Sequence, residues 1–126
     1  MKNKLVLIAE DSVEVLTFLE KWFLERGYEV IAVSNGQEAY DKIKINEKEI
    51  TLIVTDITMP IMSGVELLEK LKNEKMAKEI PKIILTTRLP KEENIEIKIM
   101  EDLKCWLLKP VDKEFFNKII DKVEKL

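Results

Sequence analysis

Short apolar runs alternate along the chain with longer stretches in which apolar residues recur at helical spacing. The run Leu5–Ala9 is apolar throughout and rich in branched residues, which is typical of a strand buried on both faces. In the stretch that follows, Leu16, Leu19 and Phe23 recur at helical spacing, and Gly27 is suited to end the helix. The beginning of the chain therefore predicts a buried strand followed by an amphipathic helix.

The same alternation continues to the end of the sequence. Strands are predicted at Leu5–Ala9, Tyr28–Val33, Leu52–Thr55, Lys82–Thr86 and Cys105–Leu108. Helices are predicted at Ser12–Arg26, Gly36–Ile45, Val65–Lys75, Lys91–Asp102 and Asp112–Glu124. Strict alternation indicates an α/β fold in which helices cover both faces of a parallel sheet. We expect one doubly wound (βα)5 domain over residues 1–126, with the strands ordered 2-1-3-4-5.

The composition narrows the chemistry of any site. The sequence has no histidine and one cysteine, Cys105, so the usual zinc ligand sets and histidine-activated nucleophiles are excluded. A net charge of −3 argues against direct DNA binding. The apolar runs are too short to cross a membrane, and no cleavable signal sequence follows the charged start. We expect a cytoplasmic protein, and any metal must be a hard ion held by oxygen.

Three acidic residues follow two strands that the expected order makes neighbours. Glu10 and Asp11 come after the first strand and Asp56 after the third. Ligands of open α/β sheets bind beyond the carboxyl ends of the strands, and clustered carboxylates repel one another unless a cation compensates them. Mg²⁺ is the simplest such cation. The alternative for Asp11 is that it caps the first helix, with Glu14 three residues on as its partner.

The loop from Asp56 to Gly64 favours a chemical role for Asp56. Pro60 restricts the residue before it to extended backbone, and Gly64 permits a tight turn where the next helix begins. An aspartate held beside a metal can act as a phosphoryl acceptor. Lys109, at the end of the fifth strand, would lie beside the acids, where its ammonium could neutralise phosphoryl oxygens. Thr86 ends the fourth strand, where its hydroxyl could donate to the same oxygens.

Taken together, four segments resemble the receiver domain of two-component response regulators, most closely the stand-alone chemotaxis type with its flavodoxin-like fold. They are Ala9–Asp11, Asp56–Gly64, Ile83–Thr86 and Trp106–Pro110, and they occur in the family's order over nearly the whole chain. The resemblance implies a regulatory protein rather than an enzyme. It would accept a phosphoryl group on Asp56 from a sensor histidine kinase or phosphotransfer protein, act on a downstream protein, and exist as a monomer or weak homodimer.

The resemblance also implies roles for individual residues. Asp11, Asp56 and the backbone carbonyl of Thr58 would ligate Mg²⁺ directly, while Glu10 would act largely through water. Lys109 would bind the phosphoryl oxygens together with the hydroxyl of Thr86.

Trp106 would occupy the aromatic switch position, turning inward as Thr86 moves toward the phosphate. Thr87 stands where the family favours alanine or glycine, and Trp106 is bulkier than the usual tyrosine or phenylalanine. Thr58 and Arg88 lie two residues beyond Asp56 and Thr86, beside the path of hydrolytic water in this family. We therefore expect Thr58, Thr87 and Arg88 to modulate dephosphorylation.

Three other classes of protein are alternatives to a phosphorylated receiver domain. A haloacid-dehalogenase-like phosphotransferase needs a second aspartate two residues after the first, and this chain has Thr58 there. A flavodoxin-like redox module needs a glycine- and hydroxyl-rich phosphate loop, whereas Glu10 and Asp11 would repel the flavin phosphate. A receiver fold that docks partners without being phosphorylated is the third alternative.

Overall fold

The computed structural model describes residues 3–87 and 103–125, and for residues 103 and 104 only the backbone. A five-stranded parallel sheet has the order β2-β1-β3-β4-β5, which confirms the predicted fold class and strand order. The strands are β1 (Leu5–Ala9), β2 (Glu29–Val33), β3 (Leu52–Thr55), β4 (Lys82–Thr86) and β5 (Leu103–Leu108). The helices are α1 (Val13–Glu25), α2 (Gly36–Asn46), α3 (Gly64–Asn73) and α5 (Lys113–Glu124). The predicted helix Lys91–Asp102 lies outside the described residues.

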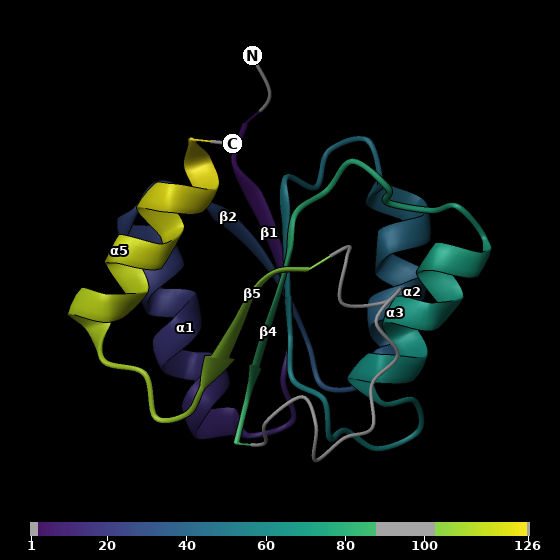
Figure 1. The fold of residues 1–126 in the computed structure, drawn as a ribbon, viewed down its shortest axis with the longest axis horizontal. Coiled ribbons are helices and arrows are strands. Elements are labelled where there is room, and N and C mark those ends of the chain that lie inside the picture. The colour runs from purple at the N-terminus through teal and green to yellow at the C-terminus, as the bar shows by residue number, and fades with distance from the viewer. Residues whose placement is uncertain (1–2, 88–102, 126) are drawn as a thin grey trace.

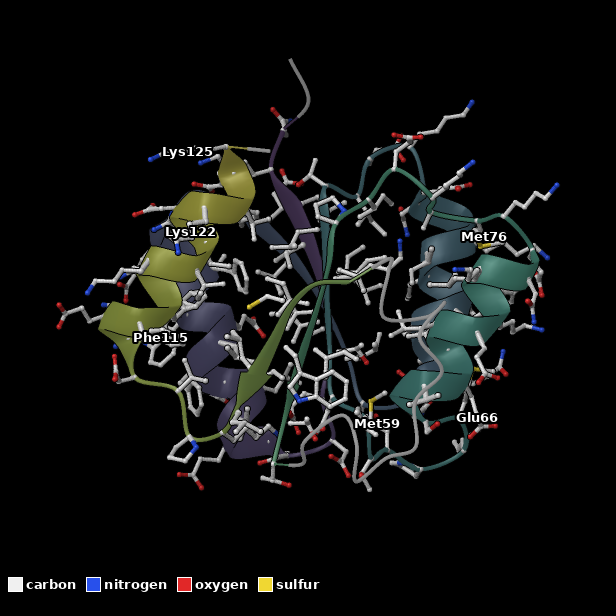
Figure 2. All side chains as sticks on the ribbon, viewed as in Figure 1. Met59, Glu66, Met76, Phe115, Lys122 and Lys125 are labelled. Carbon is white, nitrogen blue, oxygen red and sulfur yellow. The ribbon has the colours of Figure 1, made fainter. Side chains whose placement is uncertain are left out.

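Helices cover both faces of the sheet, with α1 and α5 on one side and α2 and α3 on the other (Figure 1). Successive side chains of a strand point to opposite faces, so the apolar run of β1 supplies two cores at once. Leu7 packs in the core under α2 and α3, while Val6 and Ile8 pack in the core under α1 and α5. Figure 2 shows Met59 on the α3 side and Phe115 on the α5 side.

Each described helix begins with a polar capping residue near the carboxyl edge of the sheet. The side chains of Ser12, Asn35, Ser63 and Asp112 each accept a hydrogen bond from the backbone of the first helical turn. These bonds satisfy amide groups that a helix leaves unpaired at its start. The caps therefore fix where the loops at this edge end.

Two strand boundaries differ from the prediction. β2 begins at Glu29 rather than at Tyr28, and β5 begins at Leu103 rather than at Cys105. The pairing of β4 with β5 shifts register between Lys82 and Ile83, where one residue of β5 is left unmatched. Such a bulge interrupts the alternation of inward and outward side chains, so the sequence pattern did not reveal the start of β5.

The amino end of β4 is fastened by the buried ammonium of Lys82. This group donates to the carbonyl oxygens of Ala77, at 2.6 Å, and of Ile80, at 2.9 Å. Ala77 has a positive φ of 57°, which is unusual for a residue other than glycine. The lysine thus holds the α3–β4 connection against the start of the strand.

A charged cluster at the amino edge of the sheet joins the ends of α1 and α5. The guanidinium of Arg26 donates to Asp121 at 2.6 Å and to Glu124 at 2.7 Å. Glu124 also accepts from the hydroxyl of Tyr28 at 2.7 Å and lies 3.3 Å from the ammonium of Lys4. We call these five residues the Arg26 cluster.

Candidate functional site

Glu10 and Asp56 are placed by backbone hydrogen bonds that continue the sheet beyond its strands. The amide of Glu10 donates to the carbonyl of Val33 and the amide of Asp56 to that of Ala9, both at 3.0 Å. Because β1 and β3 are neighbours, the two side chains leave the sheet at the same edge. The parallel order therefore brings together residues that are far apart in the sequence.

Asp11 completes the acidic group. One carboxylate oxygen from each of Glu10, Asp11 and Asp56 lies within 4.8 Å of the other two. Glu10 is 2% exposed and Asp56 is 8% exposed, whereas Asp11 is open to solvent. Three carboxylates at this separation repel one another, and burial of two of them strengthens the repulsion. We call these three residues the acidic site.

Lys109 reaches the acidic site from the end of β5. Its amide donates to the carbonyl of Thr86 at 2.8 Å, which holds the residue beside β4. The ammonium donates to Glu10 at 2.6 Å and to Asp56 at 2.8 Å. The peptide bond between Lys109 and Pro110 is cis, a state that the sequence left open.

The pKa values of these groups reflect their surroundings. Burial lowers the pKa of Lys109, but the hydrogen bonds and charges of Asp56 and Glu10 outweigh it, so the pKa is raised overall. Burial raises the pKa of Glu10 and the charge of Asp56 adds to the effect. Hydrogen bonds from Lys109 and from the amide of Ser12 offset only part of it. The single ammonium of Lys109 therefore does not neutralise the negative charge of the acidic site.

Asp56 is held by the loop that it begins. Its Oδ1 accepts a hydrogen bond of 2.6 Å from the amide of Ile57, and the carbonyl of Ile57 accepts from the amide of Gly64 at 2.8 Å. A Cβ at Gly64 would lie 2.0 Å from the carbonyl oxygen of Asp56, closer than any side chain allows. Glycine is required there because the loop folds back onto its own first residue.

The capping alternative for Asp11 is wrong. The cap of α1 is Ser12, whose hydroxyl accepts from the amide of Val15 at 3.3 Å. The amide of Ser12 donates to the second oxygen of Glu10 at 3.0 Å, a contact that the sequence analysis missed. A serine directly before a helical pattern is a common cap and was the available signal. The carboxylate of Asp11 is therefore not used to begin the helix.

The donor set of the acidic site fits a hard divalent cation. Carboxylate oxygens are the protein ligands that Mg²⁺ prefers, and it keeps some of its waters, which the exposure of Asp11 permits. Glu10, Asp11 and Asp56 are the side chains that could hold the ion. Thr58 belongs to the same loop and its side chain is exposed, but a role for its carbonyl stays a prediction.

The other predicted residues differ in burial. Thr86 is 1% exposed at the end of β4, and Thr87 after it is open to solvent. Trp106 is half-buried and packs against a small apolar cluster that contains Ile57, the residue next to Asp56. Arg88 lies outside the described residues. The structure thus brings Glu10, Asp11, Asp56 and Lys109 into one group.

Comparison with known proteins agrees with this arrangement. The model of the response regulator receiver domain family matches residues 6–121. The chain belongs to this family. Receiver domains are regulatory, which sets aside the phosphotransferase and redox alternatives, and they generally bind Mg²⁺ at an acidic site.

The relatives include chemotaxis and transcriptional regulators. The chain is 30% identical over 120 residues to the chemotaxis protein CheY of Treponema pallidum, covering 94% of this chain and 78% of that protein. It is 32% identical over 123 residues to the probable transcriptional regulator ycf29 of Pyropia yezoensis, covering 96% of this chain and 53% of that one. The chain thus spans about half the length of this relative.

Solved structures give the same result. The chemotaxis response regulator CheY4 of Vibrio cholerae superimposes with a TM-score of 0.83 at 26% identity, covering 97% of this chain and 99% of that one. CheY in the CheX–CheY–BeF₃–Mg²⁺ complex of Borrelia burgdorferi superimposes with a TM-score of 0.80 at 28% identity, covering 96% and 89%. Among the described residues, no helix is both long and apolar enough to cross a membrane.

Proposed function

We propose that the protein is a response regulator that accepts a phosphoryl group on Asp56 from the phosphohistidine of a histidine kinase or phosphotransfer protein. The reaction requires Mg²⁺, and a downstream protein recognises the phosphorylated form. One observation carries the proposal. The ammonium of Lys109 bonds Asp56 and Glu10 inside a group of three carboxylates, at the edge where parallel α/β sheets bind their ligands.

The two oxygens of Asp56 have different surroundings. Oδ1 accepts the amide of Ile57, whereas Oδ2 is bonded by the side chain of Lys109. Oδ2 is the acceptor, because a lysine side chain can move away while a backbone amide cannot. Oδ2 forms a bond to phosphorus, the bond between phosphorus and the imidazole nitrogen breaks, and its electron pair stays on the imidazole.

Lys109 exchanges its partners in this transfer. Its ammonium leaves Asp56 Oδ2 and binds a phosphoryl oxygen, where it offsets the charge that develops. The hydroxyl of Thr86 donates to another oxygen of the same group. Asp11 and Asp56, with the carbonyl of Thr58, would hold Mg²⁺ directly and Glu10 largely through water, and the bound ion would supply positive charge beside the phosphoryl oxygens.

The signal leaves the site through β4 and β5. Movement of Thr86 toward the phosphoryl group opens space beside Trp106, which packs on the cluster around Ile57. A local change in charge then biases the position of an aromatic side chain on the outer strand. The face formed by the predicted helix Lys91–Asp102, β5 and α5 is the surface that a partner protein recognises.

Hydrolysis of the phosphoryl group depends on the residues around it. The side chains of Thr58 and Thr87 are both exposed at this edge, where water must enter. We expect Thr87, and Arg88 after it, to narrow the path of that water and lengthen the life of the acyl phosphate. Replacing either residue by alanine should shorten that life, and unchanged lifetimes in both variants would refute the role.

The proposal is tested with a small phosphodonor. Incubation of the protein with acetyl phosphate and Mg²⁺ should raise its intact mass by one phosphate, and chelation of the metal should prevent the adduct. Asp56→Ala should form no adduct. An adduct that persists in this variant would place the acceptor elsewhere. The absence of any adduct on the wild-type protein would favour a receiver fold that docks its partners without phosphorylation.

The remaining features of the proposal concern the whole protein. We propose a cytoplasmic monomer or weak homodimer that does not bind DNA directly. Sedimentation with and without the phosphoryl group would reveal the change of assembly that a dimeric regulator requires.

A further inference from the structure

The first residue of α2 is in backbone contact with the loop that carries Asp56. The amide of Gly36 donates to the carbonyl of Met62 at 2.9 Å. Met62 belongs to the segment between Asp56 and Gly64, the loop of the proposed phosphoryl acceptor. An amide at the start of a helix needs a partner outside the helix, and here the loop provides it.

The contact is too close for any side chain at position 36. A Cβ there would lie 2.3 Å from the carbonyl oxygen of Met62 and 2.9 Å from its carbonyl carbon. Both atoms belong to the backbone, so they cannot rotate away as the end of a side chain could. Any residue other than glycine must therefore push the loop outward or pull α2 back.

The loop beside this contact has a strained turn. Ile61 has a φ of 69°, which is rare for a β-branched residue, and the amide of Met62 donates to the carbonyl of Pro60 at 2.7 Å across it. The side chain of Ile61 is 78% exposed, so its own packing does not impose this conformation. Strain of this kind persists only where neighbouring bonds enforce it. The bond from Gly36 to Met62 is such a bond.

We infer that Gly36 is a positioning residue for the phosphoryl-acceptor loop. Its close approach holds Met62 in place, keeps the turn at Ile61 closed, and thereby fixes the part of the loop that carries Thr58. The inference rests on the proposed function, since it concerns the geometry of the same metal and acceptor site. No side chain of α2 needs to reach that site for the effect.

The test compares glycine replacements at two places. Mg²⁺ binding is followed by the fluorescence of Trp106 in a Trp22→Phe background, which keeps an aromatic ring against Phe18 and Phe116. Gly36→Ala should raise the Mg²⁺ concentration for half-maximal response by about 10-fold, as changes to groups that support metal ligands do. Acetyl phosphate labelling should slow at low Mg²⁺ and recover at saturating Mg²⁺.

Gly27→Ala is the matched control. Gly27 has a φ of +86° and nothing within 4 Å of an added Cβ, so alanine strains the backbone there without touching the site. This variant should lose stability in urea but keep the wild-type Mg²⁺ response. Equal Mg²⁺ responses of the two variants would overturn the inference.

Asn35→Ala covers the case in which Gly36→Ala does not fold. Asn35 caps α2, and its side chain accepts from the amide of Glu38 at 2.8 Å, so its loss frays the turn that contains Gly36. A weakened Mg²⁺ response supports the inference, and an unchanged one overturns it. A wild-type protein that neither responds to Mg²⁺ nor becomes labelled would instead refute the proposed function.

Discussion

The acidic site and the Arg26 cluster lie at opposite edges of the same sheet and use the same kinds of bond. Each joins segments that are far apart in the sequence through short contacts between charged groups. They differ in net charge. The acidic site has three carboxylates against the ammonium of Lys109, whereas the Arg26 cluster has two cations against two carboxylates.

The difference appears in one glutamate of each group. The pKa of Glu10 is raised, with burial as the largest cause. Burial also acts to raise the pKa of Glu124, but hydrogen bonds from Tyr28, Arg26 and Lys4 outweigh it, and that pKa is lowered overall. A cluster without net charge stabilises the fold. A cluster with excess negative charge is instead held together by the fold and can be neutralised by a cation. Excess charge, rather than the number of ion pairs, distinguishes a candidate site.

Removing Lys109 should have the largest effect. Lys109→Met keeps the apolar stem but leaves Glu10 and Asp56 buried without their cation. We expect a loss of about 3 kcal/mol in the free energy of unfolding and about 100-fold slower labelling by acetyl phosphate. Urea denaturation should also show that added Mg²⁺ restores part of the stability, because the ion replaces the missing charge.

Arg26→Met is the corresponding change in the balanced cluster. It should lower the free energy of unfolding by about 2 kcal/mol, since hydrogen bonds to charged groups are lost. Added Mg²⁺ should not specifically restore this stability. Labelling of Asp56 should stay at the wild-type rate. Recovery of this variant by Mg²⁺ would contradict the distinction between the two groups.

Removing one negative charge should change the free energy of unfolding in opposite directions in the two groups. Asp56→Asn keeps an oxygen for the amide of Ile57 but relieves repulsion, so it should stabilise the metal-free protein by about 1 kcal/mol. Glu124→Gln should destabilise by about the same amount because Arg26 and Lys4 lose their partner. Both are measured in urea with a chelator present, and a loss of stability in Asp56→Asn would show that repulsion does not dominate.

The smallest effect concerns pH. The folded pKa of Glu10 lies above the usual 4.5, so in that window the folded protein holds a proton that the unfolded chain has lost. Its contribution to stability therefore falls as pH rises through the folded pKa. The folded pKa of Glu124 lies below 4.5, so its contribution is present above 4.5 and is lost as pH falls through the folded pKa.

Metal-free unfolding measured from about pH 3 to pH 7 separates the two contributions. Glu10→Gln should reduce the fall in stability above pH 4.5, and Glu124→Gln should reduce the loss below it. Each change should amount to about 1 kcal/mol or less. The same dependence of stability on pH in both variants would contradict the opposite pKa shifts of Glu10 and Glu124.

The sequence predicted the features that depend on local pattern. Continuous apolar runs identified β1 and β3, and the expected strand order placed Glu10 beside Asp56, as the structure has them. The start of β5 was missed because a bulge breaks the alternation there. The sequence predicted a helix start near Asp11 and offered Asp11 as its cap, whereas the structure shows that the hydroxyl of Ser12 takes this role.

Contacts that depend on how whole helices and loops pack could not be predicted in this way. Glycine at position 36 is compatible with an ordinary helix start, and nothing near it in the sequence indicates that the carbonyl of Met62 lies against it. The partners of Arg26 are likewise more than ninety residues away, with Asp121 at a separation of 95. Such contacts arise from the packing of whole helices, which periodicity does not encode.

The buried ammonium of Lys82 has a mechanical consequence. β4 is anchored at its amino end by the bonds to Ala77 and Ile80, while its other end holds the backbone of Thr86 against that of Lys109. β4 pairs with β3 only as far as Ile84, so we expect a displacement to be larger at Thr86 than at the anchored amino end. The bond from the amide of Lys109 to the carbonyl of Thr86 would carry such a displacement to the end of β5.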